Sequence, residues 1–193
     1  MSTTAPIKNR DNLETFKNYY LEVKPNLRNY TLVILGLNTA FRISDLLKLQ
    51  WKDVYDIKKK QFREHIVLKE QKTGKERVVA MNSTVLQILD YYYQIYKLPE
   101  PTSYLFPSAK NKSLPITRTQ AYRLIKEAAI HTGLEEHISC HSLRKTFGYH
   151  AWKQGVPPAM LMNIYNHSSY KITKRYLCIE QDERDDVYRN IHL

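Results

Sequence analysis

Apolar residues recur every three to four positions along most of this chain, which is the spacing that places them on one face of a helix. Residues 11–22, for example, carry Leu13, Phe16, Tyr20 and Leu21 at this spacing. The pattern predicts helices over residues 11–22, 26–39, 44–51, 84–97, 117–131, 142–153, 157–165 and 169–177.

Capping side chains mark several of the expected helix starts. Asn26 can cap one helix and Ser44 another, with Asp45 favourably placed in the first turn of the second. Thr117 and Gln120 form a T-x-x-Q capping box. We therefore expect helices to begin at these three places.

The pattern changes to short runs of β-branched and aromatic residues after the first third of the chain. These runs occupy residues 53–56, 62–69 and 76–81, and the last two flank a turn that contains Gly74. We expect two or three antiparallel strands there. The predicted fold class is therefore mainly α with a small antiparallel β-sheet (α+β).

The length of 193 residues allows one substantial core and is short for two. We expect a single domain over residues 1–193, with residues 1–25 as an N-terminal extension and first helix. Residues 178–193 read as an acidic, loosely patterned C-terminal tail.

The net charge of the chain indicates which class of molecule it binds. Lys and Arg number 30 against 19 Asp and Glu, which gives a formal net charge of +11 at pH 7. Such an excess favours a polyanion, although an ordinary basic protein would also fit. The two cysteines, Cys140 and Cys178, lack a pairing or metal-ligand spacing, and no apolar leader or bilayer-length run is present. We expect a soluble cytoplasmic protein that has no membrane partner.

Candidate chemistry begins with two basic residues in the first half. Arg42 lies at the junction of two expected helices, where it could pair with Asp45 or aim its planar fork at a phosphate. Lys72 lies in the hairpin turn, either as a solvated side chain or as an ammonium that protonates a leaving oxygen.

The second half adds two histidines, an arginine and a tyrosine. His141 and Arg144 are three positions apart, so they share a helix face close to its start, where an anion is favoured. His167 lies in a turn before a helix, and Tyr176 follows nine residues later. Taken singly, His167 could simply neighbour a helix cap and Tyr176 could be a packing residue.

The order and spacing of these residues resemble the tyrosine recombinase (phage integrase) family. The similar segments are TAFRISDLLKLQWKDV, EQKTGKERVVAM, HSLRKTFGYH and NHSSYKITKRY, within residues 33–180. Three positions depart from the family pattern: Phe41 stands for alanine, Lys145 for a frequent histidine and Asn166 for glycine. None of these departures removes a catalytic group.

The resemblance implies a tyrosine recombinase catalytic-domain fold and an enzyme that breaks and rejoins DNA through a covalent 3′-phosphotyrosine. Tyr176 would be the nucleophile, Arg42 and Arg144 would clamp the phosphate oxygens, and His167 would donate a further hydrogen bond. His141 would act as base or hydrogen-bond partner, and Lys72 would protonate the leaving 5′ oxygen. No metal or other cofactor is implied, because the arginines take the electrostatic role of a cation.

DNA is the implied partner, as a duplex with specific sites that are expected to be inverted repeats. Arg118, Thr119 and Arg123 begin a helix that approaches the major groove in this family, and Lys145 is a further candidate for DNA contact. A solvated basic helix face is an equal alternative for the first three.

The resemblance also implies a homo-tetramer on DNA, with a monomer in solution and an accessory DNA-bending protein as further expectations. Val187, Tyr188 and Ile191 in the C-terminal tail are the predicted docking residues for a neighbouring protomer.

Two biological roles and two other protein classes stay open. The role is expected to be DNA inversion by a single-domain enzyme in the bacterial nucleoid, with integration or excision of a mobile element nearly as well supported. A non-catalytic DNA-binding regulator with a recombinase fold and a type IB topoisomerase-like enzyme are the alternatives.

Overall fold

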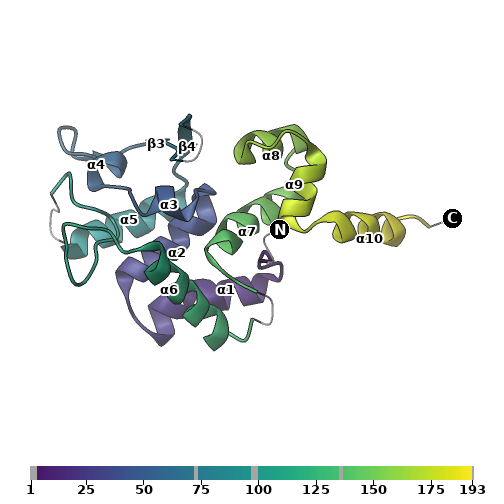
Figure 1. Cartoon of the computed structure of the whole chain (residues 1–193), viewed down its shortest axis with the longest axis horizontal. Helices are drawn as coiled ribbons and strands as arrows, with labels where there is room; N and C mark the ends of the chain where they lie inside the picture. The colour runs from purple at the N-terminus through teal and green to yellow at the C-terminus, as the bar shows by residue number, and fades with distance from the viewer. Residues whose placement is uncertain (1–3, 72–73, 97–99, 135–136, 193) are drawn as a thin grey trace.

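The computed structural model describes residues 4–71, 74–96, 100–134 and 137–192. Most of this part is helical, which confirms the predicted fold class (Figure 1). The helices are α1 (Arg10–Asn18), the π-helical turn η1 (Tyr19–Val23), α2 (Leu27–Thr39), α3 (Ile43–Leu46), α4 (Trp51–Val54), α5 (Ser83–Tyr96), α6 (Arg118–His131), α7 (Cys140–Lys153), α8 (Pro158–Tyr165), α9 (Tyr170–Leu177) and α10 (Glu180–Asn190). Over these described ranges, no helix combines the length and hydropathy needed to cross a membrane.

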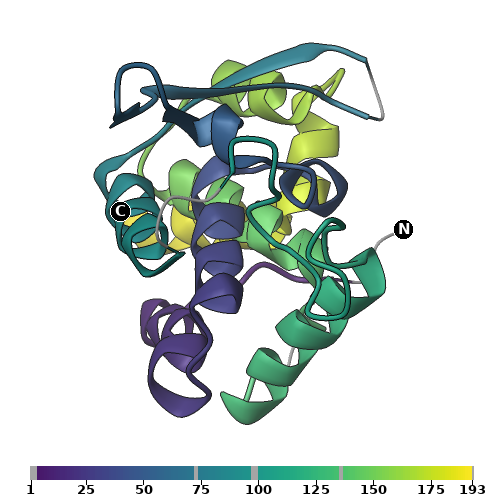
Figure 2. The same cartoon turned by 90° about the vertical axis from the view of Figure 1, so that its left-hand side faces the viewer.

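Helix α2 forms the centre of the core because it is apolar on nearly every side. It buries Leu32, Val33, Ile34 and Leu35 almost completely. Helices α5 and α7 both pack against it, as the two views show (Figures 1 and 2). The end of α2 therefore delivers the residues that follow it to the middle of the molecule.

The strands form two separate antiparallel pairs where the sequence predicted one sheet. β1 (Tyr55–Asp56) pairs with β2 (Gln61–Phe62), and β3 (His65–Lys69) pairs with β4 (Glu76–Ala80). The second pair is the hairpin that the sequence predicted around Gly74.

Part of the first predicted strand is helical. Residues 51–54 form α4, because the Asp53 carboxylate accepts a hydrogen bond from the backbone N–H of Gln50 at 2.8 Å and so closes a capping box. The expectation that residues 53–56 form a strand holds only for Tyr55 and Asp56.

Two of the three predicted caps are present. The side chain of Asn26 accepts from the backbone N–H of Asn29 at 3.1 Å at the start of α2. Thr117 and Gln120 make both hydrogen bonds of a capping box at the start of α6, at 3.1 and 2.8 Å. Both caps confirm the boundaries that the sequence predicted.

The turn between α2 and α3 differs from the prediction. Ser44 does not cap the helix, because α3 begins at Ile43 and Arg42 occupies the N-cap position. Ala40 has a left-handed backbone with φ of 51°, which costs a non-glycine residue about 1–2 kcal/mol. This strained turn sets the direction in which Arg42 leaves the end of α2.

Helices α7, α8 and α9 pack around a smaller apolar cluster that includes Tyr165 and Leu177. Their close approach requires a glycine at position 148. A Cβ added to Gly148 would lie 2.3 Å from the Tyr165 hydroxyl oxygen and 2.6 Å from a methyl carbon of Leu177. The missing side chain thus lets α9, which carries Tyr176, lie against α7, which carries Arg144.

The C-terminal segment forms a helix, where the sequence suggested a loosely patterned tail. None of the residues of α10, all of which the structure describes, is buried, and the helix extends away from the body (Figure 1). Ion pairs join it to the rest of the chain: Lys8–Asp182 at 2.6 Å, Lys153–Asp186 at 2.8 Å and Lys174–Glu183 at 2.9 Å.

Candidate active site

Arg42 is mostly buried at the turn after α2. Its Nη1 atom lies 2.7 Å from Oε2 of Glu70, in an ion pair whose N–H is not aligned as a hydrogen bond. Asp45, which the sequence suggested as a partner, instead accepts a hydrogen bond from the backbone N–H of Gln71 at 3.1 Å. Two carboxylates therefore tie the α2–α3 turn to the end of strand β3.

A second arginine, Arg77 on β4, completes a buried ionic cluster with Glu70. Its Nη1 atom lies 3.3 Å from Oε1 of Glu70, it donates to the Thr39 carbonyl at 3.3 Å, and its guanidinium lies 5.3 Å from the Phe41 ring centroid. No sequence pattern singles out Glu70 and Arg77, because they reach Arg42 only when the hairpin folds against the α2–α3 turn.

Arg144 on α7 is almost completely buried, with 4% of its surface exposed. Its guanidinium donates to the carbonyl of Ala40 and, at 3.5 Å, to that of Ile164, and it lies 4.7 Å from the Tyr165 ring centroid. The Tyr165 hydroxyl donates to the Arg144 carbonyl at 2.8 Å. Contacts from α2 and α8 therefore fix the guanidinium.

His141 lies in the first turn of α7, at the edge of the cluster. Partial burial lowers the pKa of its imidazole, and the positive charges of Lys145, Arg118 and Arg144 lower it further. The neutral ring is favoured at neutral pH, and a neutral imidazole can accept a proton.

His167 follows α8 and points its ring at the same cluster. Its Nδ1 lies 3.1 Å from the hydroxyl oxygen of Thr173, and its ring stacks on Tyr165 with 5.5 Å between centroids. Burial lowers the pKa of His167, and the charges of Arg144 and Arg42 lower it further.

Asn166, beside His167, explains one departure from the family pattern. It ends α8 with a left-handed backbone, φ 53°, a conformation in which glycine is preferred and asparagine is the usual substitute. Its Oδ1 also accepts a hydrogen bond from Nζ of Lys75 at 3.0 Å. The substitution therefore preserves the turn and connects it to the β3–β4 hairpin.

Tyr176 on α9 lies within the same group of side chains. Its ring centroid is 5.2 Å from that of His167 and 5.3 Å from that of Tyr165. Burial raises the pKa of the Tyr176 hydroxyl, while the charge of Arg144 and a hydrogen bond from it act in the opposite direction. The hydroxyl therefore stays protonated at neutral pH and needs a base before it can attack.

The structure thus gathers most of the residues that the sequence nominated. Arg144, His167 and Tyr176 are in contact, and the charge of Arg42 acts on the pKa of all three. His141 lies at the edge of this group, and burial lowers its pKa, as do the charges of Arg144 and Arg42. The sixth predicted catalytic residue, Lys72, lies outside the described residues.

The start of α6 carries the predicted DNA-contacting residues. Arg118, Thr119 and Arg123 are all exposed. A pocket of about 570 Å³ is lined by Arg118 and Thr119 together with His141. The basic start of α6 therefore adjoins the candidate active site.

Lys145 does not fit the predicted DNA contact. It is 2% exposed, its ammonium donates to the carbonyl of Thr4, and it lies 3.8 Å from Sγ of Cys178 and 5.2 Å from the Tyr176 ring centroid. Burial also lowers its pKa. Lys145 faces the interior because α7 turns this position towards the N-terminal segment and α9.

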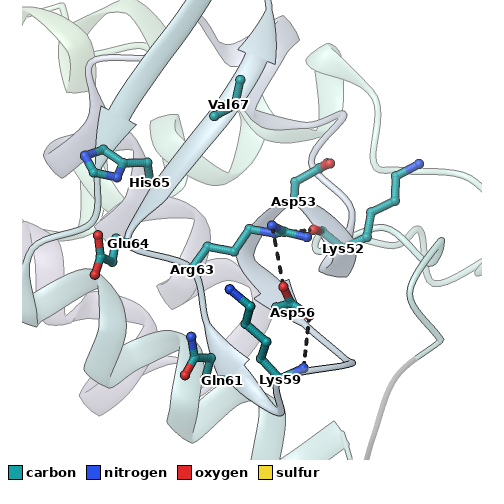
Figure 3. A pocket seen from close by; sticks show the side chains of 9 residues that line it. All are labelled: Lys52, Asp53, Asp56, Lys59, Gln61, Arg63, Glu64, His65 and Val67. Carbon is teal, nitrogen blue, oxygen red and sulfur yellow. Dashed lines mark hydrogen bonds and ion pairs between the residues drawn. The ribbon is translucent and has the colours of Figure 1, made fainter.

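A second hollow, of about 640 Å³, lies beside strands β1 to β3 (Figure 3). Arg63 crosses it, donating to the Lys52 carbonyl at 2.9 Å and lying 4.0 Å from a carboxylate oxygen of Asp56. Its lining has three Lys or Arg and three Asp or Glu residues and none of the described catalytic candidates, so it has no excess charge for a phosphate. The lining residues are Lys52, Asp53, Asp56, Lys59, Gln61, Arg63, Glu64, His65 and Val67.

Two curated proteins are similar to this chain in sequence. The "Probable integrase/recombinase YoeC" of Bacillus subtilis (strain 168) is 40% identical over 189 residues, which are 98% of this chain and 97% of YoeC. The "Tyrosine recombinase XerD" of Staphylococcus saprophyticus subsp. saprophyticus is 26% identical over 170 residues, 86% of this chain and 55% of XerD. The chain therefore spans nearly all of YoeC and about half of XerD.

Solved recombinases share the fold. The XerA recombinase superposes with a TM-score of 0.76 at 19% identity, over 100% of this chain and 66% of XerA. The XerH site-specific recombinase, bound to a palindromic difH substrate, superposes with a TM-score of 0.74 at 17% identity, over 98% of this chain and 54% of XerH. The model of the phage integrase family matches residues 9–183. The chain therefore belongs to the phage integrase family of tyrosine-type site-specific recombinases.

Proposed function

We propose that this chain cuts and rejoins DNA at specific sites through a covalent 3′-phosphotyrosine formed by Tyr176. The observation that supports this most strongly is the meeting of Tyr176, Arg144 and His167 within one chain, with the two rings 5.2 Å apart. A protein that only binds DNA would not need a tyrosine hydroxyl beside a buried guanidinium.

Arg42, Arg144 and His167 stabilise the charge that develops during cleavage. Attack on the phosphodiester places negative charge on its non-bridging oxygens, and two guanidiniums and an imidazole N–H can donate to them. Burial and an ion pair to Glu70 already fix Arg42, and hydrogen bonds fix Arg144 and His167, so these donors stabilise the transition state with little reorganisation. Their fixed positions also hold the phosphate for in-line attack.

Proton transfers complete the exchange. His141, neutral at working pH, accepts the proton of Tyr176 as the oxygen–phosphorus bond forms. Lys72 gives a proton to the 5′ oxygen as its bond to phosphorus breaks. An incoming 5′ hydroxyl then reverses both steps and releases Tyr176 with the strand rejoined.

DNA recognition is assigned to the exposed start of α6. Arg118 and Arg123 can donate to guanine edges or to phosphates, and Thr119 can bond either kind of group. Arg118 and Thr119 line the same pocket as His141, which fits a duplex that reaches both the active site and this helix.

Assembly on DNA is assigned to α10. Val187 and Tyr188 in α10 and Ile191 directly after it are 55%, 82% and 58% exposed, so this segment presents apolar side chains to the solvent. We expect these side chains to dock on a neighbouring protomer in a tetramer that synapses inverted-repeat sites in the bacterial nucleoid, with a DNA-bending protein as helper. Inversion of a segment and integration or excision of a mobile element both use this chemistry.

Covalent capture tests the proposed reaction. The protein is incubated with a randomised duplex library that carries a nick near the centre, so that a cleaved strand cannot be rejoined, and adducts that resist SDS are recovered and sequenced. We expect an enriched sequence and a covalent complex. Tyr176→Phe should abolish the complex and keep binding to the enriched duplex, whereas Tyr91→Phe, at an exposed tyrosine of α5, serves as the matched control.

Two other outcomes would assign the chain differently. Binding to the enriched duplex without any adduct would identify a DNA-binding regulator. An adduct on every sequence, with relaxation of supercoiled DNA by the monomer, would identify topoisomerase activity.

A further inference from the structure

We infer that Glu70 is a positioning residue that orients Arg42 towards the scissile phosphate, an inference that rests on the proposed cleavage reaction. Glu70 is the last residue before the hairpin turn and is 6% exposed. Its carboxylate lies between Arg42 at 2.7 Å and Arg77 at 3.3 Å.

The charges explain why this carboxylate is buried there. The guanidiniums of Arg42 and Arg77, whose side chains are 19% and 14% exposed, lie on either side of it. Burial lowers the pKa of a third guanidinium, that of Arg144, and the positive charges of both arginines lower it further. Such a group of like charges is unfavourable unless an anion lies among them. Glu70 supplies that anion before DNA arrives, so Arg42 can stay near the site without a bound phosphate.

The contact leaves Arg42 able to bind DNA. A guanidinium has five N–H donors, and the contact to Glu70 uses the Nη1 side. The carboxylate therefore holds one edge of the fork and leaves other donors for phosphate oxygens, as a carboxylate behind a metal-bound histidine fixes the ring without touching the substrate.

The hairpin fixes the carboxylate in turn. The backbone N–H of Glu70 donates to the Lys75 carbonyl at 2.9 Å, and its carbonyl accepts from the N–H of Gly74 at 2.9 Å. Asp45 adds a second link from the α2–α3 turn to the hairpin at Gln71. Glu70 thus connects the conformation of the hairpin to the orientation of Arg42.

Replacing Glu70 by glutamine keeps its shape and removes its charge. We expect Glu70→Gln to bind the enriched duplex with unchanged affinity and to form the covalent complex about ten- to a hundredfold more slowly in single turnover. Glu64→Gln is the matched control, since it removes one carboxylate at the other end of β3, in the separate hollow of Figure 3. That variant should react at the wild-type rate.

Two further measurements separate positioning of Arg42 from other roles. With a 5′-bridging phosphorothiolate substrate the leaving thiolate needs no proton, so a defect that persists there does not act through Lys72. In a double-mutant cycle, Glu70→Gln should slow an Arg42→Ala protein by less than about threefold, because both changes remove the same interaction. The phosphorothiolate substrate keeps the slow variants measurable.

Several results would overturn the inference. A folded Glu70→Gln protein that forms the covalent complex at the wild-type rate would do so. So would a Glu70→Gln defect that disappears with the phosphorothiolate substrate. A third contradicting result would be a double variant whose loss of rate is the product of the losses in the two single variants. If glutamine prevents folding, Glu70→Asp keeps the charge but withdraws it from Arg42, and a wild-type rate for that variant would count equally against the inference. Failure of the proposed function itself is distinct, because the wild-type protein would then form no adduct.

Discussion

At the scale of single residues, the main feature of the site is a group of buried charged side chains. Arg42, Arg77 and Arg144 are largely buried, and Glu70 is the carboxylate that lies between two of them. A phosphate would bring a second negative charge to the same cluster. We therefore expect DNA binding to relieve repulsion that the free protein retains.

The two site histidines predict how stability depends on pH. Both have a folded-state pKa below the ordinary value of about 6.5, so the unfolded chain binds more protons below that pH. The free energy of unfolding should therefore fall as the pH drops below about 6.5. Urea unfolding of wild type and of a His141→Gln, His167→Gln double variant checks this, since the variant should show a shallower loss. An identical slope in both proteins would contradict the assignment.

The buried position of Lys145 predicts a difference from Arg118. Loss of a phosphate contact lowers the slope of log affinity against log salt by about 1. Arg118→Ala should therefore weaken binding to the enriched duplex and reduce this slope, whereas Lys145→Met should leave the slope unchanged. Fluorescence anisotropy over a salt series measures both, and an equal reduction for Lys145→Met would restore it as a DNA contact.

Residue types and spacing made most of the candidate site predictable. His141, Arg144, His167 and Tyr176 could be nominated because each stands in a motif with a fixed local distance to the next. Glu70 could not, because a buried carboxylate far from its partners in sequence has no local signature. The burial of Lys145 was missed for the same reason: the segment that covers it lies over 130 residues away.

At the scale of elements, the packing of α7, α8 and α9 positions the nucleophile. Helix α7 carries Arg144, α9 carries Tyr176, and Tyr165 at the end of α8 contacts both. At Gly148 these helices lie so close that an added Cβ would meet Tyr165 and Leu177, so the absence of a side chain there affects the geometry of the site.

Adding a methyl group at this point should damage both stability and cleavage. In Gly148→Ala the new Cβ would overlap the ring of Tyr165, whose hydroxyl bonds to Arg144, so we expect a loss of about 1–3 kcal/mol and slower adduct formation. In Gly36→Ala the new Cβ would meet the flexible end of Leu143, so this control should lose less. Urea unfolding and covalent capture measure the two effects, and wild-type behaviour of Gly148→Ala would refute the packing argument.

Element boundaries were predictable where a side chain closes the helix, as at Asn26 and Thr117. The prediction failed at Ser44, because α3 begins at Ile43 and Arg42, which pairs with the distant Glu70, occupies the N-cap position. It also failed for α10, whose helix depends on ion pairs to Lys8, Lys153 and Lys174 instead of an apolar stripe.

At the scale of the whole molecule, the structure combines a packed body with a projecting helix. Helix α10 has no buried residue among its fully described positions, and its apolar side chains Val187 and Tyr188 are 55% and 82% exposed. This division predicts that cleavage belongs to the body and assembly to the helix.

Deleting residues 181–193 separates the two activities. We expect the shortened protein to form the covalent complex with a single site but to fail in synapsis of two sites, because the docking side chains are gone. Native gel electrophoresis of two-site complexes measures synapsis, and a Val187→Ser, Ile191→Ser variant tests the apolar contact without removing the helix. Unchanged synapsis by the shortened protein would contradict the assigned role of α10.

The most direct test of the central claim is to identify the residue that is joined to DNA. Trypsin cleaves after Arg175 and Arg184, and the peptide between them, YLCIEQDER, contains a single tyrosine. Mass spectrometry of the nuclease-trimmed covalent complex should find a nucleotide 3′-phosphate on Tyr176 in this peptide. A nucleotide attached to any other residue, such as Tyr165 or Tyr170, would contradict the account.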